Sequence, residues 1–256
     1  MEHKRRKIER EFGVPIGGEI LEPQFWTRTA IKDLPKEGPL PLKEIFGREA
    51  PLIVDAGCGN GRFLIGQAVW NPGTDYLGAD ILPVVIRYAT RRANQRGLTN
   101  LRFLVGDGIG FAQNLLPKGR VSQFHCYHPQ PYHDPRRALE RMINPRFLSL
   151  VHQSLVPGGE FFIQTDSQAY WKYIQGIIGK FFEFQERVGC WPDAPKGRTR
   201  REILALRRGF RVFRGKGIRR DALTPEDLSR LETTLPLPNF ITEPEVQHLD
   251  RAEREE

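Results

Sequence analysis

The chain has 256 residues, with 39 Lys and Arg against 31 Asp and Glu, a formal net charge of +8, and 39% hydrophobic residues. A chain of this length and composition buries a sizeable core, which excludes a disordered tail and a membrane protein. Its three cysteines, Cys58, Cys126 and Cys190, form no CxxC pair, so we expect neither a zinc knuckle nor a disulfide framework, and a reducing compartment fits best.

Residues 1–45 read as a partly ordered lead-in, because they are rich in Pro and Gly. The charged start of the chain is not followed by an apolar segment of the signal-peptide type, and no run approaches 18 apolar residues. These features predict a cytoplasmic protein without a membrane partner.

From Pro51 onwards, short apolar runs alternate with segments whose apolar residues recur at helical spacing. The predicted strands are residues 52–54, 76–79, 101–105, 123–127 and 160–165, and the predicted helices are residues 63–68, 84–92 and 145–155. Strands that alternate with helices in this way indicate βαβ units and a mainly parallel sheet.

Four acids, Asp55, Asp80, Asp107 and Asp166, each close one of these predicted strands. Ligands of open parallel sheets bind outside the carboxyl ends of the strands, so we expect the four acids to converge on one crevice. Core packing does not explain four acids in such positions, whereas a bound ligand does.

The loop after the first predicted strand carries Gly57, Gly59 and Gly61, which allow a tight turn and a close approach of the backbone to a ligand. The spacing is G-x-G-x-G, not the dinucleotide pattern G-x-G-x-x-G, so nothing specifically cradles a pyrophosphate. A loop that offers backbone and Asp55 to a cationic, phosphate-free ligand suits S-adenosylmethionine (SAM). Asp80 is placed to bind ribose hydroxyls. Asp107, with Gly108 beside it, is placed to bind adenine.

The positive charge is concentrated in residues 196–220, which hold eleven Lys or Arg and one acid, a net charge of +10. Residues 221–256 are acidic, with a net charge of −7. A basic segment of this kind indicates a polyanion partner, although a solvated, self-neutralising surface is the alternative. The candidate phosphate contacts are Arg136, Arg137, Arg198, Arg200, Arg201, Arg207, Arg208, Arg211 and Arg214.

Several motifs resemble those of the bacterial tRNA (guanine-N7)-methyltransferases, class I SAM-dependent enzymes that methylate a variable-loop guanine of tRNA. The likeness runs from about Phe46 to Phe213 and includes residues 98–102, P-x-F at 145–147, L-x-P-G-G at 155–159, T-D at 165–166 and residues 196–202. It implies a Rossmann-like class I methyltransferase fold, with a mainly parallel seven-stranded sheet flanked by helices. The methyltransferase domain would span residues 46–215, followed by an acidic C-terminal extension over residues 216–256.

The central motif of that family, F-P-D-P-W-x-K, corresponds here to H-P-Q-P-Y-H-D at residues 128–134. The catalytic-site Asp of the family falls on Gln130 and the substrate-side Lys on Asp134. We therefore expect Gln130 at the meeting point of cofactor and catalytic site, and Asp134 as a replacement acid beside the substrate. The alternative is that Asp134 caps a helix that begins near Pro135.

By the same resemblance, Asp166, Thr199, Arg200, Arg201 and Glu202 would form the guanine pocket, with the acids accepting hydrogen bonds from the N1 and N2 edge. Guanine N7 is an unprotonated nucleophile, so methyl transfer needs positioning and no general base. The altered loop leaves two alternatives. One is a methyltransferase of another RNA base or of a small molecule, and the other is a catalytically weak SAM-binding protein that binds RNA through its basic face.

A metal site is a further hypothesis, because His125, Cys126, His128 and His133 lie within nine residues. No outlying pair of ligands accompanies them, so we expect no structural metal.

Overall fold

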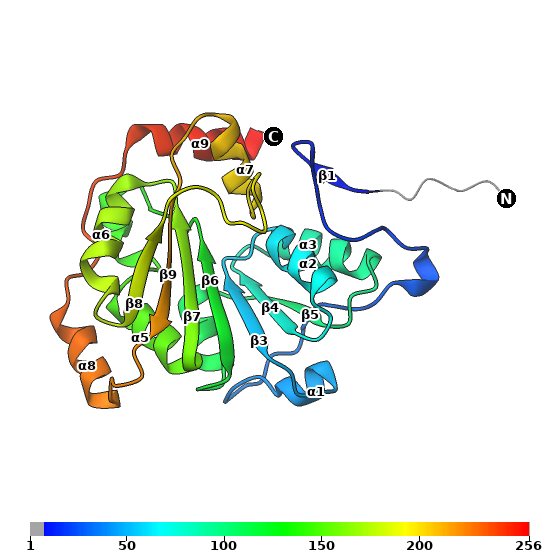
Figure 1. Ribbon diagram of the computed structural model, residues 1–256, viewed down its shortest axis with the longest axis horizontal. Coiled ribbons are helices and arrows are strands. Elements are labelled where there is room, and N and C mark those ends of the chain that lie inside the picture. The colour runs from blue at the N-terminus through cyan, green and yellow to red at the C-terminus, as the bar shows by residue number, and fades with distance from the viewer. Residues whose placement is uncertain (1–7, 256) are drawn as a thin grey trace.

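The computed structural model describes residues 8–255; the first seven residues of the predicted lead-in, and Glu256, lie outside the described residues. A seven-stranded sheet dominates the chain, with strand order β5-β4-β3-β6-β7-β9-β8 (Figure 1). Its strands are β3 (Leu52–Ala56), β4 (Asp75–Asp80), β5 (Leu101–Val105), β6 (Val121–Tyr127), β7 (Leu155–Thr165), β8 (Phe182–Arg187) and β9 (Phe213–Arg219). All neighbours pair in parallel except β9, which runs antiparallel to β7 and β8. The expected mainly parallel, seven-stranded sheet is confirmed.

Helices cover both faces of this sheet and one of its ends. They are α1 (Leu42–Phe46), α2 (Arg62–Trp70), α3 (Pro83–Gln95), α4 (Gly108–Gly110), α5 (Pro145–Ser154), α6 (Gln168–Ile178), α7 (Arg200–Arg207), α8 (Pro225–Thr234) and α9 (Pro244–Glu255). Other helical segments are the 3-10 helices η1 (Pro23–Phe25) and η3 (Pro135–Glu140) and the π-helix η2 (Phe111–Leu115). Pro at the first helical position begins α3, α5 and α8, where its missing N–H is no loss.

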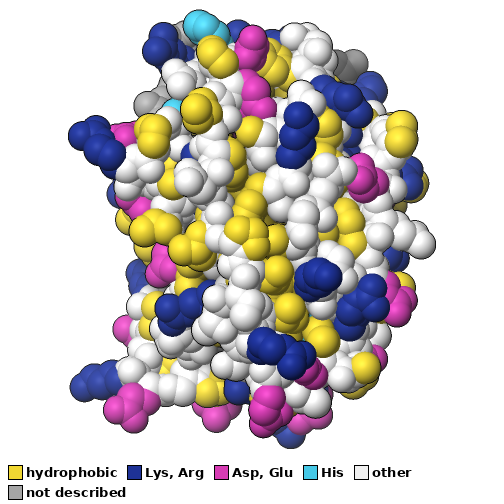
Figure 2. All heavy atoms as spheres, turned by 90° about the vertical axis from the view of Figure 1, so that its left-hand side faces the viewer, with side chains coloured by type: hydrophobic (Ala, Val, Ile, Leu, Met, Phe, Trp, Pro, Cys, Tyr) yellow, Lys and Arg dark blue, Asp and Glu magenta, His cyan; other side chains and the backbone are white. Residues whose placement is uncertain are grey.

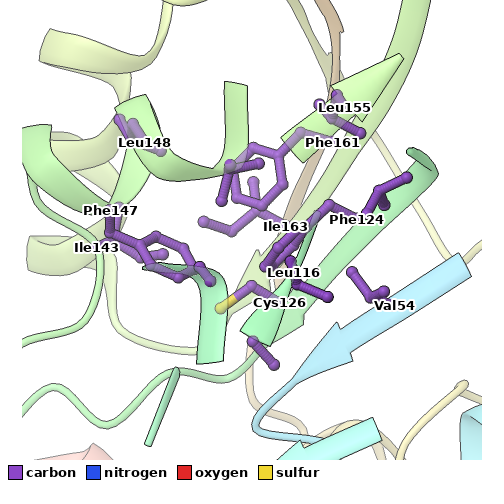
Figure 3. Packing of buried hydrophobic residues seen from close by; sticks show 14 of the residues in the cluster. Val54, Leu116, Phe124, Cys126, Ile143, Phe147, Leu148, Leu155, Phe161 and Ile163 are labelled. Atoms are coloured by element: carbon purple, nitrogen blue, oxygen red, sulfur yellow. The ribbon is translucent and has the colours of Figure 1, made fainter. Parts of the chain in front are cut away.

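The alternation of side chains along the strands produces one apolar cluster on each face of the sheet. On one face, Val54, Phe124 and Phe161 pack against Phe147 and Leu148 of α5 (Figure 3). The other face carries the second cluster, in which α2 and α3 pack on β4 and β5; its members include Phe63, Leu64, Ile86, Leu101 and Phe103.

The face on the α6 and α8 side of the molecule carries hydrophobic and charged side chains intermixed (Figure 2). Lys and Arg side chains on this face stand apart from one another and do not form a single stripe.

The N-terminal segment adds to the sheet and to the helices beside it. A hairpin of β1 (Arg10–Glu11) and β2 (Val14–Pro15) precedes a stretch that runs along the outer edge of β5. There the Ile31 N–H donates to the Phe103 carbonyl, and the Phe103 N–H donates to the Thr29 carbonyl, both at 2.8 Å. At the other end of the chain, the predicted domain boundary at residue 215 falls inside β9.

Candidate active site

Chain order along the sheet reverses between β3 and β6, and two adjoining cavities lie at the carboxyl ends of the strands there. The larger has a volume of about 410 Å³ and the smaller about 250 Å³. Both are lined by Gly57, Asp80, Leu82, Tyr127, His128 and Gln130. The two cavities therefore form one crevice with a shared central wall.

The glycine loop after β3 forms part of that wall. Gly57, Gly59 and Gly61 have φ values of +84°, +53° and +75°, a region that side chains disfavour. A Cβ at Gly57 or Gly59 would meet open space, whereas one at Gly61 would lie 2.7 Å from Phe103. The first two glycines therefore present backbone to the crevice, and Gly61 serves the packing of the loop on the sheet.

Asp80, the last residue of β4, holds this loop in place. Its Oδ2 accepts from the Gly59 N–H and its Oδ1 from the Leu82 N–H, both at 2.9 Å. Burial raises the pKa of Asp80, and these two hydrogen bonds oppose the rise. Each carboxylate oxygen has a second lone pair, so Asp80 retains the capacity to accept from a ligand in either cavity.

Asp107 and Gly108 line the smaller cavity only. The Asp107 side chain caps α4 by accepting from the Gly110 N–H at 2.7 Å. The structure thus brings Asp80 and Asp107 together on one side of the crevice.

Asp55 lies apart from the other three strand-end acids. Its side chain is 1% exposed, its Oδ1 has no hydrogen-bond partner among the described residues, and it lines neither cavity. Burial raises the pKa of Asp55 well above its ordinary value, the charge of Asp80 adds to this, and Arg198 opposes it.

Gln130 lines both cavities, whereas Asp134 lines neither. Asp134 is the N-cap of η3 and accepts from the Arg136 N–H at 2.9 Å. Its carboxylate also pairs with the Arg136 guanidinium, and these hydrogen bonds lower the pKa of Asp134 to about 2. The structure thus shows the capping arrangement that the sequence left as an alternative.

Asp166, directly after β7, belongs to the larger cavity and pairs with Arg201 of α7 at 2.7 Å. Burial alone would raise the pKa of Asp166, but the neighbouring His128 and Arg201 outweigh it and hold the pKa below its usual range. Arg201 also pairs with Asp250 at 2.7 Å and Glu253 at 3.0 Å, both on α9. These two acids line the larger cavity.

The remaining predicted substrate residues surround the N-terminus of α7. Thr199 caps the helix by accepting from the Glu202 N–H, and Arg200 lies 3.6 Å from Glu11 of the N-terminal hairpin; both line the larger cavity. Glu202 does not line it, because it is fully buried and pairs with Arg214 at 2.6 Å.

Sequence reasoning missed the contributions of His128, Asp250 and Glu253 to this wall. For Asp250 and Glu253, the sequence does hold one indication: the basic residues 196–220 are followed by acidic residues, and the opposite charges predict contacts between the two segments. Nothing in the sequence pairs a particular acid with Arg201.

The side chains considered for a metal point in different directions. Cys126 packs in the first apolar cluster, His125 Nδ1 lies 2.6 Å from the Tyr127 hydroxyl, and His133 lies between Thr242 and Asp250. Within residues 8–255, no group of three or more His, Cys, Asp or Glu side chains is arranged to hold a metal ion.

The helices of the described chain are all too short or too polar to cross a membrane.

Known proteins of similar sequence are named as methyltransferases. Residues 49–213 match a family model described as "Putative methyltransferase". A protein of Nitrosococcus oceani named tRNA (guanine-N(7)-)-methyltransferase is 31% identical over 199 residues, which cover 78% of this chain and 83% of that protein. A protein of the same name from Halorhodospira halophila is 29% identical over 212 residues, covering 81% of this chain and 91% of that protein.

Among solved structures, the 16S rRNA methyltransferase KamB matches with a TM-score of 0.56 at 17% sequence identity. The match covers 75% of this chain and 98% of that chain. At this identity the likeness concerns the fold alone.

Proposed function

Because the chain belongs to the tRNA (guanine-N7-)-methyltransferase family, we propose that it transfers a methyl group from SAM to N7 of a variable-loop guanine in tRNA. The observation that carries this proposal is the continuous crevice, in which a glycine and carboxylate cradle leads directly into a charged pocket formed by α7 and α9.

The residues of the crevice fit SAM. Gly57 and Gly59 leave open space where a side chain would stand, and Asp80 supports the loop while keeping lone pairs for ribose hydroxyls. Asp107 lines the smaller cavity and not the larger one, and its second oxygen suits the adenine amino group. When bound, SAM supplies an electrophilic methyl group, and these residues orient it towards the larger cavity.

The larger cavity would hold the base. Guanine N7 carries a free lone pair, so no side chain has to remove a proton, and the residues act by orienting the base and excluding water. Gln130 lies on the wall shared by both cavities, where its amide would contact both donor and acceptor of the methyl group. Thr199 and Arg200 border the same space at the start of α7.

Recognition of the RNA backbone would rest on the exposed part of the basic segment. Lys196, Arg207 and Arg211 are exposed, whereas Arg214 is buried with Glu202 and Arg201 is occupied by three acids. Phosphate contacts from Lys and Arg set the register of a bound RNA and make its affinity depend on salt.

The test incubates the protein with labelled SAM and unmodified bulk tRNA, and then maps 7-methylguanosine by borohydride and aniline cleavage. We expect cleavage at one variable-loop position, and its loss in Asp80→Ala, which removes the acceptor for the backbone N–H groups of Gly59 and Leu82. Asp221→Ala is the matched control, since Asp221 also accepts a backbone N–H, from Gly158, but lies away from the crevice.

Two outcomes contradict the proposal. Methylation of a different base would indicate another RNA substrate, and tight tRNA binding without methyl incorporation would indicate an RNA-binding protein that uses the basic face alone.

A further inference from the structure

The C-terminal helix α9 is a wall of the larger cavity. It lies beside α7 above one end of the sheet (Figure 1), and its Leu249 is buried in a cluster with Leu204, Ala205 and Val212. The apolar side of α9 is buried, with Val246, Leu249 and Ala252 each 5% exposed or less, and the same helix brings Asp250 and Glu253 to the cavity.

Arg201 connects α9 to the strand ends. Its Nε donates to Asp166 Oδ2 at 2.7 Å, and its Nη1 reaches Asp250 Oδ1 at 2.7 Å and Glu253 Oε2 at 3.0 Å. One buried guanidinium thus orders three carboxylates from two distant parts of the chain. Such an arrangement fixes the positions of the carboxylates but also occupies some of their oxygens.

The carboxylates differ in what they can still accept. Asp250 uses its second oxygen on His133 at 2.8 Å, and Asp166 has its second oxygen 3.4 Å from His128 Nδ1. Glu202 is fully buried behind the wall. Glu253 alone among these acids has an oxygen, Oε1, with no partner among the described residues, and its side chain is 32% exposed.

A second group that lines the cavity, His128, has a fixed polarity. The Trp191 N–H donates to Gln164 Oε1, so the Gln164 amide nitrogen faces His128 Nε2 at 3.2 Å and donates to it. With Nε2 accepting, His128 Nδ1 is the ring atom that faces Asp166 Oδ1, 3.4 Å away. His128 and Asp166 are thus engaged with each other, and the free acceptor in the cavity is Glu253 Oε1.

Guanine matches this acceptor in the orientation that methylation at N7 requires. N7 and the O6 acceptor lie on one edge of the base, and the N1–H and 2-amino donors lie away from N7. With N7 facing a methyl donor at the glycine loop, the N1–H and 2-amino donors point away from that loop, into the rest of the larger cavity. Residues of α7 and α9 line that cavity, and Glu253 is one of them.

We infer that Glu253 is a substrate-specificity residue, whose free Oε1 accepts a hydrogen bond from the N1–H or 2-amino group of the target guanine. Arg201 and Asp250 are positioning residues that hold the Glu253 carboxylate in place. This inference rests on the proposed function, and it assigns to α9 the acceptor role that sequence resemblance gave to Asp166 and Glu202.

The experiment compares Glu253→Gln with Glu245→Gln, a matched control in the exposed first turn of the same helix. A glutamine at 253 can keep its oxygen on Arg201 only by turning its amide donors towards the guanine donors. We expect kcat/KM for tRNA methylation to fall about tenfold or more in Glu253→Gln, as for loss of a hydrogen bond to a charged group, and to stay unchanged in Glu245→Gln. Binding of S-adenosylhomocysteine and the melting temperature report whether each variant is folded.

A tRNA with inosine at the target position separates contact from structure, because inosine lacks only the 2-amino group. If the 2-amino group is the donor, inosine slows the wild type and has little further effect on Glu253→Gln. If N1–H is the donor, inosine leaves the wild-type rate unchanged while Glu253→Gln remains slow on both substrates, with its S-adenosylhomocysteine binding and melting temperature unchanged. Both results support the inference, whereas a slow Glu253→Gln that has also lost cofactor binding or melts lower than Glu245→Gln overturns it.

Equal rates for Glu253→Gln and Glu245→Gln would overturn it. So would a faster Glu253→Gln, which would make α9 an obstacle to the substrate. These outcomes are distinct from a failure of the proposed function, in which the wild type itself forms no 7-methylguanosine.

Discussion

His125 lies in a chain of hydrogen bonds that fixes its protonation. Arg198 donates to the Tyr127 hydroxyl at 2.6 Å, so that hydroxyl donates in turn to His125 Nδ1. The His125 ring is stacked on Phe162 with a centroid distance of 4.6 Å. Burial lowers the pKa of His125 well below its ordinary value, and the charge of Arg198 lowers it further. The imidazole therefore remains neutral in the folded protein.

A pH dependence of stability follows. The unfolded chain binds a proton on His125 below about pH 6.5, whereas the folded chain does not, so the free energy of unfolding falls as the pH drops from 7 to 5. The slope approaches about 1.4 kcal/mol per pH unit for each such histidine. His152, whose pKa burial also lowers, contributes in the same direction.

Urea unfolding at several pH values checks this. In His125→Asn the slope between pH 6 and pH 5 should be shallower by about 1.4 kcal/mol per pH unit. His248→Asn, which changes an exposed histidine of α9, should leave the slope as it is. An unchanged slope in His125→Asn would contradict the assignment.

The four strand-end acids show how far single residues can be predicted. Their places at or near the ends of β3, β4, β5 and β7 could be expected, since in each case an apolar run stops at or just before an acid. Their environments could not. Asp166 meets Arg201 from 35 residues away, and Asp55 is buried without a partner on Oδ1, and both depend on how distant segments pack.

At the scale of elements, the basic segment divides into parts with different roles. It forms a loop, α7 and β9, so its cations face in several directions. One group of its cations pairs with acids of the chain and includes Arg198, Arg201, Arg214 and Lys216. The other group is exposed: Arg207 lies over the ring of Phe12, and Arg211 lies over the ring of Phe213. A count of charges along the sequence finds the segment but does not separate these two groups, because the pairing acids come from elsewhere.

This division predicts which cations bind RNA. The double substitution Arg207→Ala and Arg211→Ala should weaken tRNA binding and flatten the dependence of log K on log salt by about 0.7–0.9 for each phosphate that the protein no longer neutralises. Filter binding over a series of salt concentrations measures both quantities, and SAM binding should be unchanged. The double substitution of Lys118 and Arg120, exposed residues ahead of β6 at the opposite end of the sheet, should leave both quantities unaltered. Equal effects of the two double variants on tRNA binding would show that binding depends on the overall positive charge of the protein and not on Arg207 and Arg211 in particular.

The strands themselves were the most predictable elements. All five predicted strands correspond to β3–β7, and the three predicted helices correspond to α2, α3 and α5. The antiparallel β9 escaped prediction, because its alternation is hidden by glycines and arginines in Phe213–Arg219. The reason for those glycines is steric, since a Cβ at Gly215 would lie 2.1 Å from the Phe184 ring.

At the scale of the whole molecule, segments near both ends of the described chain contact residues of the crevice. Glu11, from the lead-in that was expected to be partly ordered, lies 3.6 Å from Arg62, 3.4 Å from Arg92 and 3.6 Å from Arg200. It is 6% exposed and also accepts from the Asn60 side chain at 2.7 Å. Contacts between segments so far apart in sequence cannot be found from local patterns.

Glu11 therefore matters to stability as well as to the shape of the site. Glu11→Ala leaves the buried Arg62 without its acid, and removal of one partner of a buried ion pair costs about 3–5 kcal/mol. We expect a loss near the lower end of this range in the free energy of unfolding, measured with urea, because Arg62 keeps its bonds to the Val14 and Pro15 carbonyls. Glu44→Ala, at an exposed position of α1, is the control. An equal effect of both substitutions on the free energy of unfolding would contradict a stabilising role for the ion pair between Glu11 and Arg62.

The stretch around Ala30 hinders the pairing of this sheet with the sheet of another copy of the protein. By bonding to both sides of Phe103, it occupies backbone groups at the outer edge of β5 that would otherwise be open to a foreign strand. The opposite border of the sheet, β8, carries the exposed charges of Glu183, Glu186 and Arg187. Bulky charged side chains discourage strand addition, so the sheet is guarded against edge-to-edge aggregation at one border by its own chain and at the other by charge.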